Sequence, residues 1–301
     1  MDSPTTTLIH ILRNRVDELV AAGDLEEAVH AATAAVLKAQ QSLSSDLDSI
    51  DEFASSLEVR GDVYRLLGRF EEARDDYKQA IDQLDNRPDR CLQLGRLHAG
   101  YGSVHDQLDH PDRAKQLWQE AVRYFEMSDP PASLDIASMS NNLAVIQRNE
   151  GDTEGAEAEY LKALEILHRE LGPDHEETAA VCNNIGALYQ SAGLHEQARE
   201  MHMMALEARR KNFGDNHHDT AQSHNNLALA LLATGDSAWA RRHFEKAVSG
   251  FEALGVEYAS DLQAVAENYC AVLQAEGDYA HAETIAARVP GGMAMPEPEL
   301  A

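Results

Sequence analysis

A period of about 42 residues runs through this sequence and limits its possible folds more than any other feature. The pair Asn141-Asn142 recurs as Asn183-Asn184 and Asn225-Asn226, at a spacing of 42 residues each time. Single glycines and alanines keep the same step: Gly151, Gly193, Gly235, Gly277, Ala156, Ala198, Ala240 and Ala282. A fixed period of this length is typical of a repeat array, in which each unit buries its apolar side only against its neighbours.

The period also extends towards the N-terminus. The repeated alanine is found again at Ala114, Ala73 and Ala28, after steps of 42, 41 and 45 residues. Gly68 and Gly23 lie five residues before their alanines, as the later glycines do, whereas the third unit has Asp109 at that place.

Seven units are therefore predicted, from about Thr5 to Val289. We divide the chain into three irregular repeats in residues 1–136, four regular repeats in residues 137–289, and a tail in residues 290–301 that is rich in proline and glycine. Such a tail cannot extend the stack, and it is either disordered or lies back on the last pair of helices.

Each unit reads as two helices joined by a short turn. From Asp135 to Asn149, apolar residues are spaced by three and four, which indicates one face of an amphipathic helix. Gly151 favours the left-handed backbone that ends a helix, and Asp152 can cap the next one. The second helix ends before Gly172-Pro173. No segment alternates like a strand, so we predict an all-α fold of antiparallel helix pairs.

Small and aromatic residues alternate along the second helices. The places of Ala156, Tyr160 and Ala163 are taken in other units by Ala73, Tyr77 and Ala80, by Ala114, Trp118 and Ala121, by Ala198, His202 and Ala205, and by Ala240, Phe244 and Ala247. We expect the alanines to allow close approach of the two helices, and the ring between them to fill the space towards the next pair.

These residues resemble the tetratricopeptide repeat, and the long period resembles the variant of kinesin light chains. Gly186, Tyr189, Ala198 and Ala205 have the spacing of the tetratricopeptide consensus. The kinesin light chain pattern appears as Asn141-Asn142-Leu143-Ala144, Gly151 with Ala156-Glu157, Ala163-Leu164-Glu165-Ile166 and Leu171-Gly172-Pro173-Asp174-His175. The strong match covers about residues 137–289, and the first three units match loosely.

The resemblance implies a right-handed superhelical solenoid of about seven tetratricopeptide helix-turn-helix repeats, with a concave face lined by the first helix of each pair. It also implies a protein that binds other proteins and is not an enzyme. A short chain of this type is further similar to the bacterial kinesin light chains, which accompany bacterial tubulins. The expected partner is accordingly a bacterial tubulin filament or an extended peptide. No heptad coiled coil precedes the repeats, so binding to a kinesin heavy chain is not expected.

The asparagine pairs need a cause, because asparagine is a mediocre helix former. By the resemblance, Asn142, Asn184, Asn226 and Asn268 would point into the concave groove, where an amide can donate to and accept from a peptide backbone. Alternatively, one member of each pair joins adjacent helix pairs. Both interpretations remain open, and the predicted binding residues also include the partner asparagines of the first three pairs, Asn141, Asn183 and Asn225.

Other positions fall on the same predicted face: Arg148, Gln190, Arg65, Asp106 and Gln274. A clamp for a carboxylate needs several basic residues, and only scattered arginines occur there. We therefore expect neither a chaperone-type carboxylate clamp nor the recognition of acidic peptides that contain tryptophan.

The charge excludes some classes of partner. Lys and Arg number 25 against 52 Asp and Glu, which gives a net charge of −27. Nucleic acid and anionic membranes are therefore not expected partners. A basic segment of a partner would suit the chain, although the charge also serves solubility. The three distant cysteines, the absence of a basic-apolar leader and the lack of a long apolar run favour the cytoplasm.

The sequence offers little support for catalysis or metal binding. His217, His218 and His224 are the densest group of the 14 histidines, but no zinc spacing occurs, and caps and packing explain them better than a metal. Cys182 and Cys270 read as small packing residues. No phosphate loop or nucleophile elbow occurs, so no catalytic residue and no cofactor are predicted, and an enzyme or a metal-binding protein is only a remote alternative.

Overall fold

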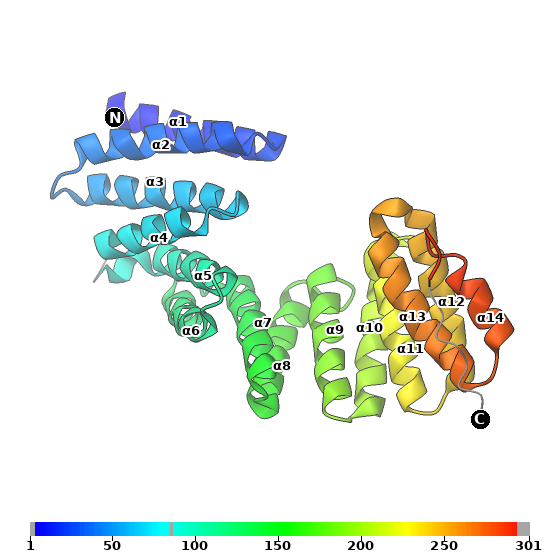
Figure 1. The fold of residues 1–301 in the computed structure, drawn as a ribbon. Helices are drawn as coiled ribbons and strands as arrows, with labels where there is room; N and C mark the ends of the chain where they lie inside the picture. The colour runs from blue at the N-terminus through cyan, green and yellow to red at the C-terminus, as the bar shows by residue number, and fades with distance from the viewer. Residues whose placement is uncertain (1–3, 85–86, 294–301) are drawn as a thin grey trace. The chain divides into compact units, whose positions relative to one another are not determined.

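The computed structural model describes residues 4–84 and 87–293, and these residues form helices joined by short loops (Figure 1). The helices are α1 (Pro4–Ala22), α2 (Leu25–Ser42), α3 (Leu47–Leu66), α4 (Phe70–Leu84), α5 (Cys91–Gln107), α6 (Pro111–Met127), α7 (Ser133–Glu150), α8 (Thr153–Glu170), α9 (Glu176–Ser191), α10 (His195–Phe213), α11 (His218–Ala233), α12 (Ser237–Leu254), α13 (Ala259–Ala275) and α14 (Tyr279–Ala286). Short 3₁₀ turns, η1 (Pro88–Arg90) and η2 (Val256–Tyr258), precede α5 and α13. The described part of the chain has no strand, and the predicted all-α class is confirmed.

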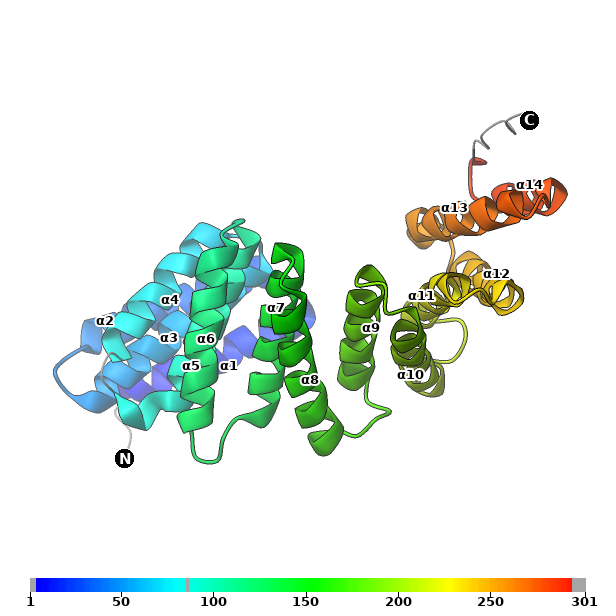
Figure 2. The same cartoon turned by 90° about the horizontal axis from the view of Figure 1, so that it is seen from below.

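The predicted repeats correspond to successive helix pairs, from α1 with α2 to α13 with α14. The chain forms two compact units, Met1–Ile146 and Gln147–Ala301, and the division lies inside α7. In the first unit the pairs α1–α2, α3–α4 and α5–α6 stack in chain order (Figure 1). In the second unit α9–α10, α11–α12 and α13–α14 do so (Figure 2).

A shared hydrogen-bond pattern turns the chain between the two helices of each pair. In the turn between α7 and α8, the Gly151 amide donates to the Arg148 carbonyl at 3.1 Å, and the Asp152 amide donates to the Gln147 carbonyl at 2.9 Å. This pair of bonds is the Schellman motif, which needs a left-handed residue after the helix. The same two bonds recur in all seven turns.

Asp109 confirms the predicted alignment of the third unit. Its φ of 59° makes it the one positive-φ residue other than glycine among residues 4–84 and 87–293. The glycines at the equivalent place in the other six turns have φ between 73° and 86°. An aspartate tolerates this backbone better than most residues, so the third turn keeps its geometry without glycine.

The small residues of the second helices are buried as predicted. Seven repeated alanines have no exposed surface: Ala28, Ala73, Ala114, Ala156, Ala198, Ala240 and Ala282. The rings that follow them in the five middle units are also buried, with 4% exposure or less: Tyr77, Trp118, Tyr160, His202 and Phe244. Close packing inside each pair therefore comes from the repeated alanine and aromatic positions.

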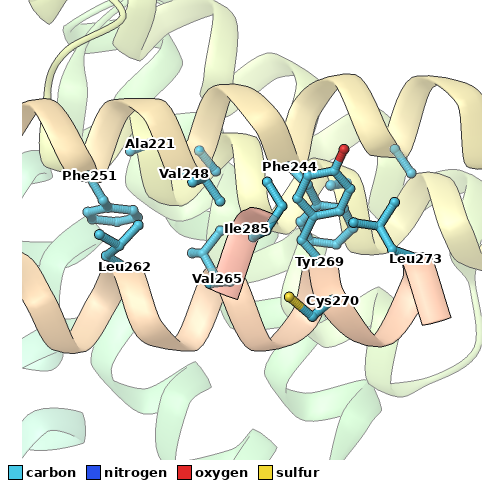
Figure 3. Packing of buried hydrophobic residues seen from close by; sticks show 14 of the residues in the cluster. Ala221, Phe244, Val248, Phe251, Leu262, Val265, Tyr269, Cys270, Leu273 and Ile285 are labelled. Carbon is cyan, nitrogen blue, oxygen red and sulfur yellow. The ribbon is translucent and has the colours of Figure 1, made fainter. Parts of the chain in front are cut away.

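Rings and branched side chains join one helix pair to the next. Between α12 and α13, Phe244 stacks on Tyr269 with 5.4 Å between the ring centroids, and Phe251 lies beside Leu262 (Figure 3). Ile285 of α14 closes the same cluster. Met293 also packs against it, so the first residues of the predicted tail lie on the last pair; residues 294–301 are outside the described part of the chain.

Candidate binding surface

The predicted asparagines all lie on first helices. Asn183 and Asn184 belong to α9, Asn225 and Asn226 to α11, and Asn268 to α13. Asn225 is buried, with 5% exposure, and the other four are half-buried. Two or three places after these asparagines the helix has a small residue, such as Gly186, which faces the second helix of its own pair. This orientation of the helix determines where the asparagines lie.

Hydrogen bonds between asparagines connect successive first helices. Asn226 Nδ2 donates to Asn183 Oδ1 at 2.8 Å, and Asn268 Nδ2 donates to Asn225 Oδ1 at 3.3 Å. The second asparagine of one repeat thus reaches the first asparagine of the repeat before it. We name these four residues the asparagine ladder. It supports the interpretation that the pairs join adjacent repeats.

Further bonds hold the ladder in place. His202 Nδ1 lies 3.2 Å from Asn183 Oδ1, and Gln222 Nε2 donates to Asn226 Oδ1 at 3.1 Å. Because Asn183 Oδ1 can only accept, Nδ1 of His202 must carry the hydrogen. Burial lowers the pKa of His202 to about 4, so this neutral form persists at neutral pH. Its Nε2 is buried and has no partner among the described residues.

Part of the hydrogen-bonding capacity of the ladder is unused. Within the described part of the chain, Asn268 Oδ1 accepts no bond and Asn183 Nδ2 donates none. Asn226 and Asn268 also keep one amide hydrogen each, since an NH₂ group has two. The interpretation as a peptide-binding face is therefore compatible with the ladder and remains a prediction.

The other predicted residues fall into two groups. In the second unit, Arg148 of α7, Gln190 of α9 and Gln274 of α13 are half-buried. In the first unit, Asn141 Nδ2 donates to Asn142 Oδ1 at 3.5 Å. Asn142 lines a cavity of about 280 Å³ together with Arg65 and Asp106, so the structure brings these three predicted residues together.

Two carboxylates on α3 line a cavity but were not among the residues predicted from the sequence. Glu58 and Asp62 line a cavity of about 350 Å³ with Arg65 and Arg96. Gln93 Nε2 donates to Glu58 at 3.0 Å, and the Tyr77 hydroxyl donates to Asp62 at 2.7 Å. Burial raises the pKa of both carboxyls. Their spacing of four residues on one helix was a usable signal, but no such pair recurs at the repeat period.

The histidines at the start of α11 and between α11 and α12 make structural contacts. His217 caps the helix by accepting from the Asp219 amide at 3.3 Å. His224 is 1% exposed, and its Nδ1 lies 2.8 Å from Nδ1 of His243 on α12. Burial lowers the pKa of His224 to about 3 and that of His243 to about 4. In the described residues, no three His, Cys, Asp or Glu side chains gather as metal ligands.

The cysteines are buried and make no disulfide. Cys270 Sγ lies 3.3 Å from the Ala282 carbonyl, where α13 contacts α14. Burial raises the pKa of Cys182 to about 11. Neither thiol has the lowered pKa of a reactive cysteine, and both fill tightly packed positions as predicted.

One further property concerns membranes. None of the helices described here is long and apolar enough to cross a lipid bilayer.

Comparisons with known proteins agree with the fold. Models of the tetratricopeptide repeat match residues 135–211, 180–253 and 13–89, which together are more than half of the chain. No curated protein matches the chain.

Solved structures show the same architecture. The chain is similar to BtubC (BKLC) from P. vanneervenii, with 25% identity, a TM-score of 0.66, and coverage of 76% of this chain and 92% of that one. It is also similar to the C-terminal part of a TPR repeat-containing protein from Cytophaga hutchinsonii, with 15% identity, a TM-score of 0.61 and coverage of 95% and 96%. The apo form of RapI has 12% identity, a TM-score of 0.68 and coverage of 94% and 99%. The last two show the fold alone.

Proposed function

Because this chain belongs to the tetratricopeptide repeat family, as an all-α solenoid of helical hairpins, we propose that it is a non-enzymatic scaffold that binds an extended segment of a partner protein. The binding face is formed by the first helices α9, α11 and α13. The observation that carries the proposal is the asparagine ladder, which holds several amides in fixed positions on these helices.

The ladder suits a peptide backbone for a chemical reason. An extended chain presents a carbonyl and an amide at every residue, and an asparagine side chain can bond to either. The ladder bonds and His202 fix the positions of the side chains in advance, which reduces the ordering cost on binding. Such contacts ask little of the partner's sequence, so they favour an extended backbone over a particular side chain.

The narrower proposal is that the partner is a bacterial tubulin filament. It rests on the kinesin light chain pattern of residues 137–289 and on the similarity to BtubC. Sedimentation of the full-length protein with polymerised bacterial tubulin tests it, with enrichment in the pellet as the expected result. A pellet without enrichment over the filament-free control would refute the tubulin proposal.

A general adaptor for linear peptides is the second candidate, and the amides left free on the ladder favour it. An array of immobilised peptides is the probe. Several peptides should bind the full-length protein, and the variant Asn226→Ala with Asn268→Ala, which removes two ladder amides, should lose them. An array that does not distinguish this variant from the wild type would count against peptide binding at the ladder.

A matched control separates binding from folding in both experiments. Gln119→Ala with Gln197→Ala removes two exposed amides from the second helices α6 and α10. This control should bind as well as the wild type. If the folded asparagine variant also binds like the wild type, the ladder is a structural device only. Thermal unfolding followed by circular dichroism shows whether each variant is folded.

A further inference from the structure

An open groove with an unusual charge lies on the surface between the second helices of the last two pairs. The groove lies between α12 and α14, has a volume of about 590 Å³, and contains Tyr269 and Ile285 at its base. Four basic side chains line it, Arg241, Arg242, Lys246 and Arg288, against the single carboxylate of Glu245. The whole chain has twice as many acidic as basic residues, so this cluster opposes the charge of the molecule.

Two of the four cations act as bridges. Arg288, two residues after the end of α14, pairs with Glu245 at 2.6 Å and with Glu252 at 2.7 Å, both on α12. Arg241 of α12 pairs with Glu276 at 3.0 Å and with Asp278 at 2.8 Å, which lie just before α14. These pairs hold α12 and α14 at a fixed separation. They also occupy Glu245, the carboxylate that lines the groove.

Arg242 and Lys246 make no close ion pair in the described part of the chain, although Lys246 is near enough to Asp215 to help lower the pKa of that carboxyl. Both side chains are exposed. Arg242 lies over the ring of Trp239, 4.8 Å from its centroid, and that tryptophan is 52% exposed. The two cations are one turn apart on the same face of α12, and like charges at this spacing repel each other. A bound anionic group would remove this repulsion.

The spacing of the two cations indicates the shape of the ligand. Four residues of helix rise by about 6 Å. Alternate residues of an extended peptide are about 6.6 Å apart and point to the same side. Two carboxylates separated by one residue therefore match Arg242 and Lys246 in register. The residue between the two carboxylates would point away from Arg242 and Lys246.

We propose that the groove between α12 and α14 binds an acidic linear segment of a partner protein, in which two carboxylates are separated by one residue. This surface lies on second helices, so it is independent of the asparagine ladder on the first helices. The chain would then have two binding faces with different chemistry. The asparagine ladder presents neutral amides, and the groove presents the two cations Arg242 and Lys246.

Fluorescence anisotropy with labelled peptides tests the proposal on the full-length protein. The probe is Ser-Glu-Leu-Glu-Ser, compared with the same peptide carrying Gln for both Glu and with the isomer Ser-Glu-Glu-Leu-Ser. The first peptide should bind, and the Gln peptide should bind about tenfold more weakly, since two exposed ion pairs are lost. The isomer should also be weaker, because its carboxylates point to opposite sides.

Variants of the protein locate the site. Arg242→Gln with Lys246→Gln should weaken binding of the first peptide about tenfold. The control Arg74→Gln with Lys78→Gln removes two cations at the same spacing from α4 and has the same net charge, and it should bind like the wild type. Unchanged binding by the Arg242/Lys246 variant, or an equal loss in both variants, would overturn the proposal. Equal affinity for the peptide and its isomer would overturn the matched spacing.

Discussion

Individual small residues set how closely the two helices of a pair pack. A Cβ atom at Gly102 would lie 2.6 Å from the ring of Trp118, and one at Gly186 would lie 2.6 Å from the ring of His202. Such distances leave no room for a methyl group unless the ring moves. The glycine on the first helix and the ring on the second therefore depend on each other.

The buried rings should carry much of the stability. Phe244 has no exposed surface and stacks on Tyr269, so Phe244→Ala should lower the free energy of unfolding by about 3–5 kcal/mol. Phe213→Ala is the control, because Phe213 is 40% exposed and stacks on the half-buried ring of His217. Urea unfolding measures both. Equal losses would mean that burial between α12 and α13 is not the cause.

Buried neutral histidine makes the stability depend on pH. The pKa of His202 falls from 6.5 to about 4 on folding. Between these values the unfolded chain binds the proton more readily, so stability is lost as the pH falls from about 6.5 to about 4. The total loss is on the order of 3 kcal/mol for this one group.

His202→Phe tests this origin. The variant carries the aromatic side chain that Phe244 provides two helices later, and it should unfold with a shallower dependence on pH in that window. His224 and His243, whose pKa values are also lowered by burial, should keep part of the slope in the variant. Urea unfolding at a series of pH values is the measurement. An unchanged slope would show that His202 does not titrate as described.

At the scale of helices, the asparagine ladder connects α9, α11 and α13. Asn226→Ala removes the bond to Asn183 and leaves the acceptor with His202 alone. The free energy of unfolding should fall by about 1 kcal/mol. Gln197→Ala, an exposed amide on α10, should change it by less than about 0.5 kcal/mol. Chemical denaturation that ranks the two variants in the opposite order would exclude a connecting role for Asn226.

The helices and turns were predictable because their causes are local. The repeated glycine and alanine positions identified all seven pairs, and even Asp109 was placed correctly in its turn. The partners of the asparagines were not predictable, because the bonding residues lie 43 positions apart and both members of a pair had plausible roles. Glu58 and Asp62 were missed because they belong to the irregular first repeats, where only glycine and alanine spacing guided the alignment.

At the scale of the whole molecule, the net charge of −27 should weaken the folded state through self-repulsion. Many of the ion pairs join near neighbours on exposed surface, such as Arg199 with Glu196, and each contributes little. Added salt should therefore weaken the repulsion between the acidic side chains more than the attraction within the ion pairs. The thermal midpoint should rise between about 10 mM and about 150 mM salt, where the Debye length falls from about 30 Å to about 8 Å. A falling midpoint in a salt series would show that the ion pairs outweigh the repulsion.

The first helices of the second unit form the proposed binding face for a partner protein. Hydrogen exchange of the full-length chain, measured with and without polymerised bacterial tubulin, tests it most directly because it reports every helix at once. Binding should slow exchange in α9, α11 and α13 around Asn184, Asn226 and Asn268. Protection confined to other helices when filaments bind would contradict the proposal.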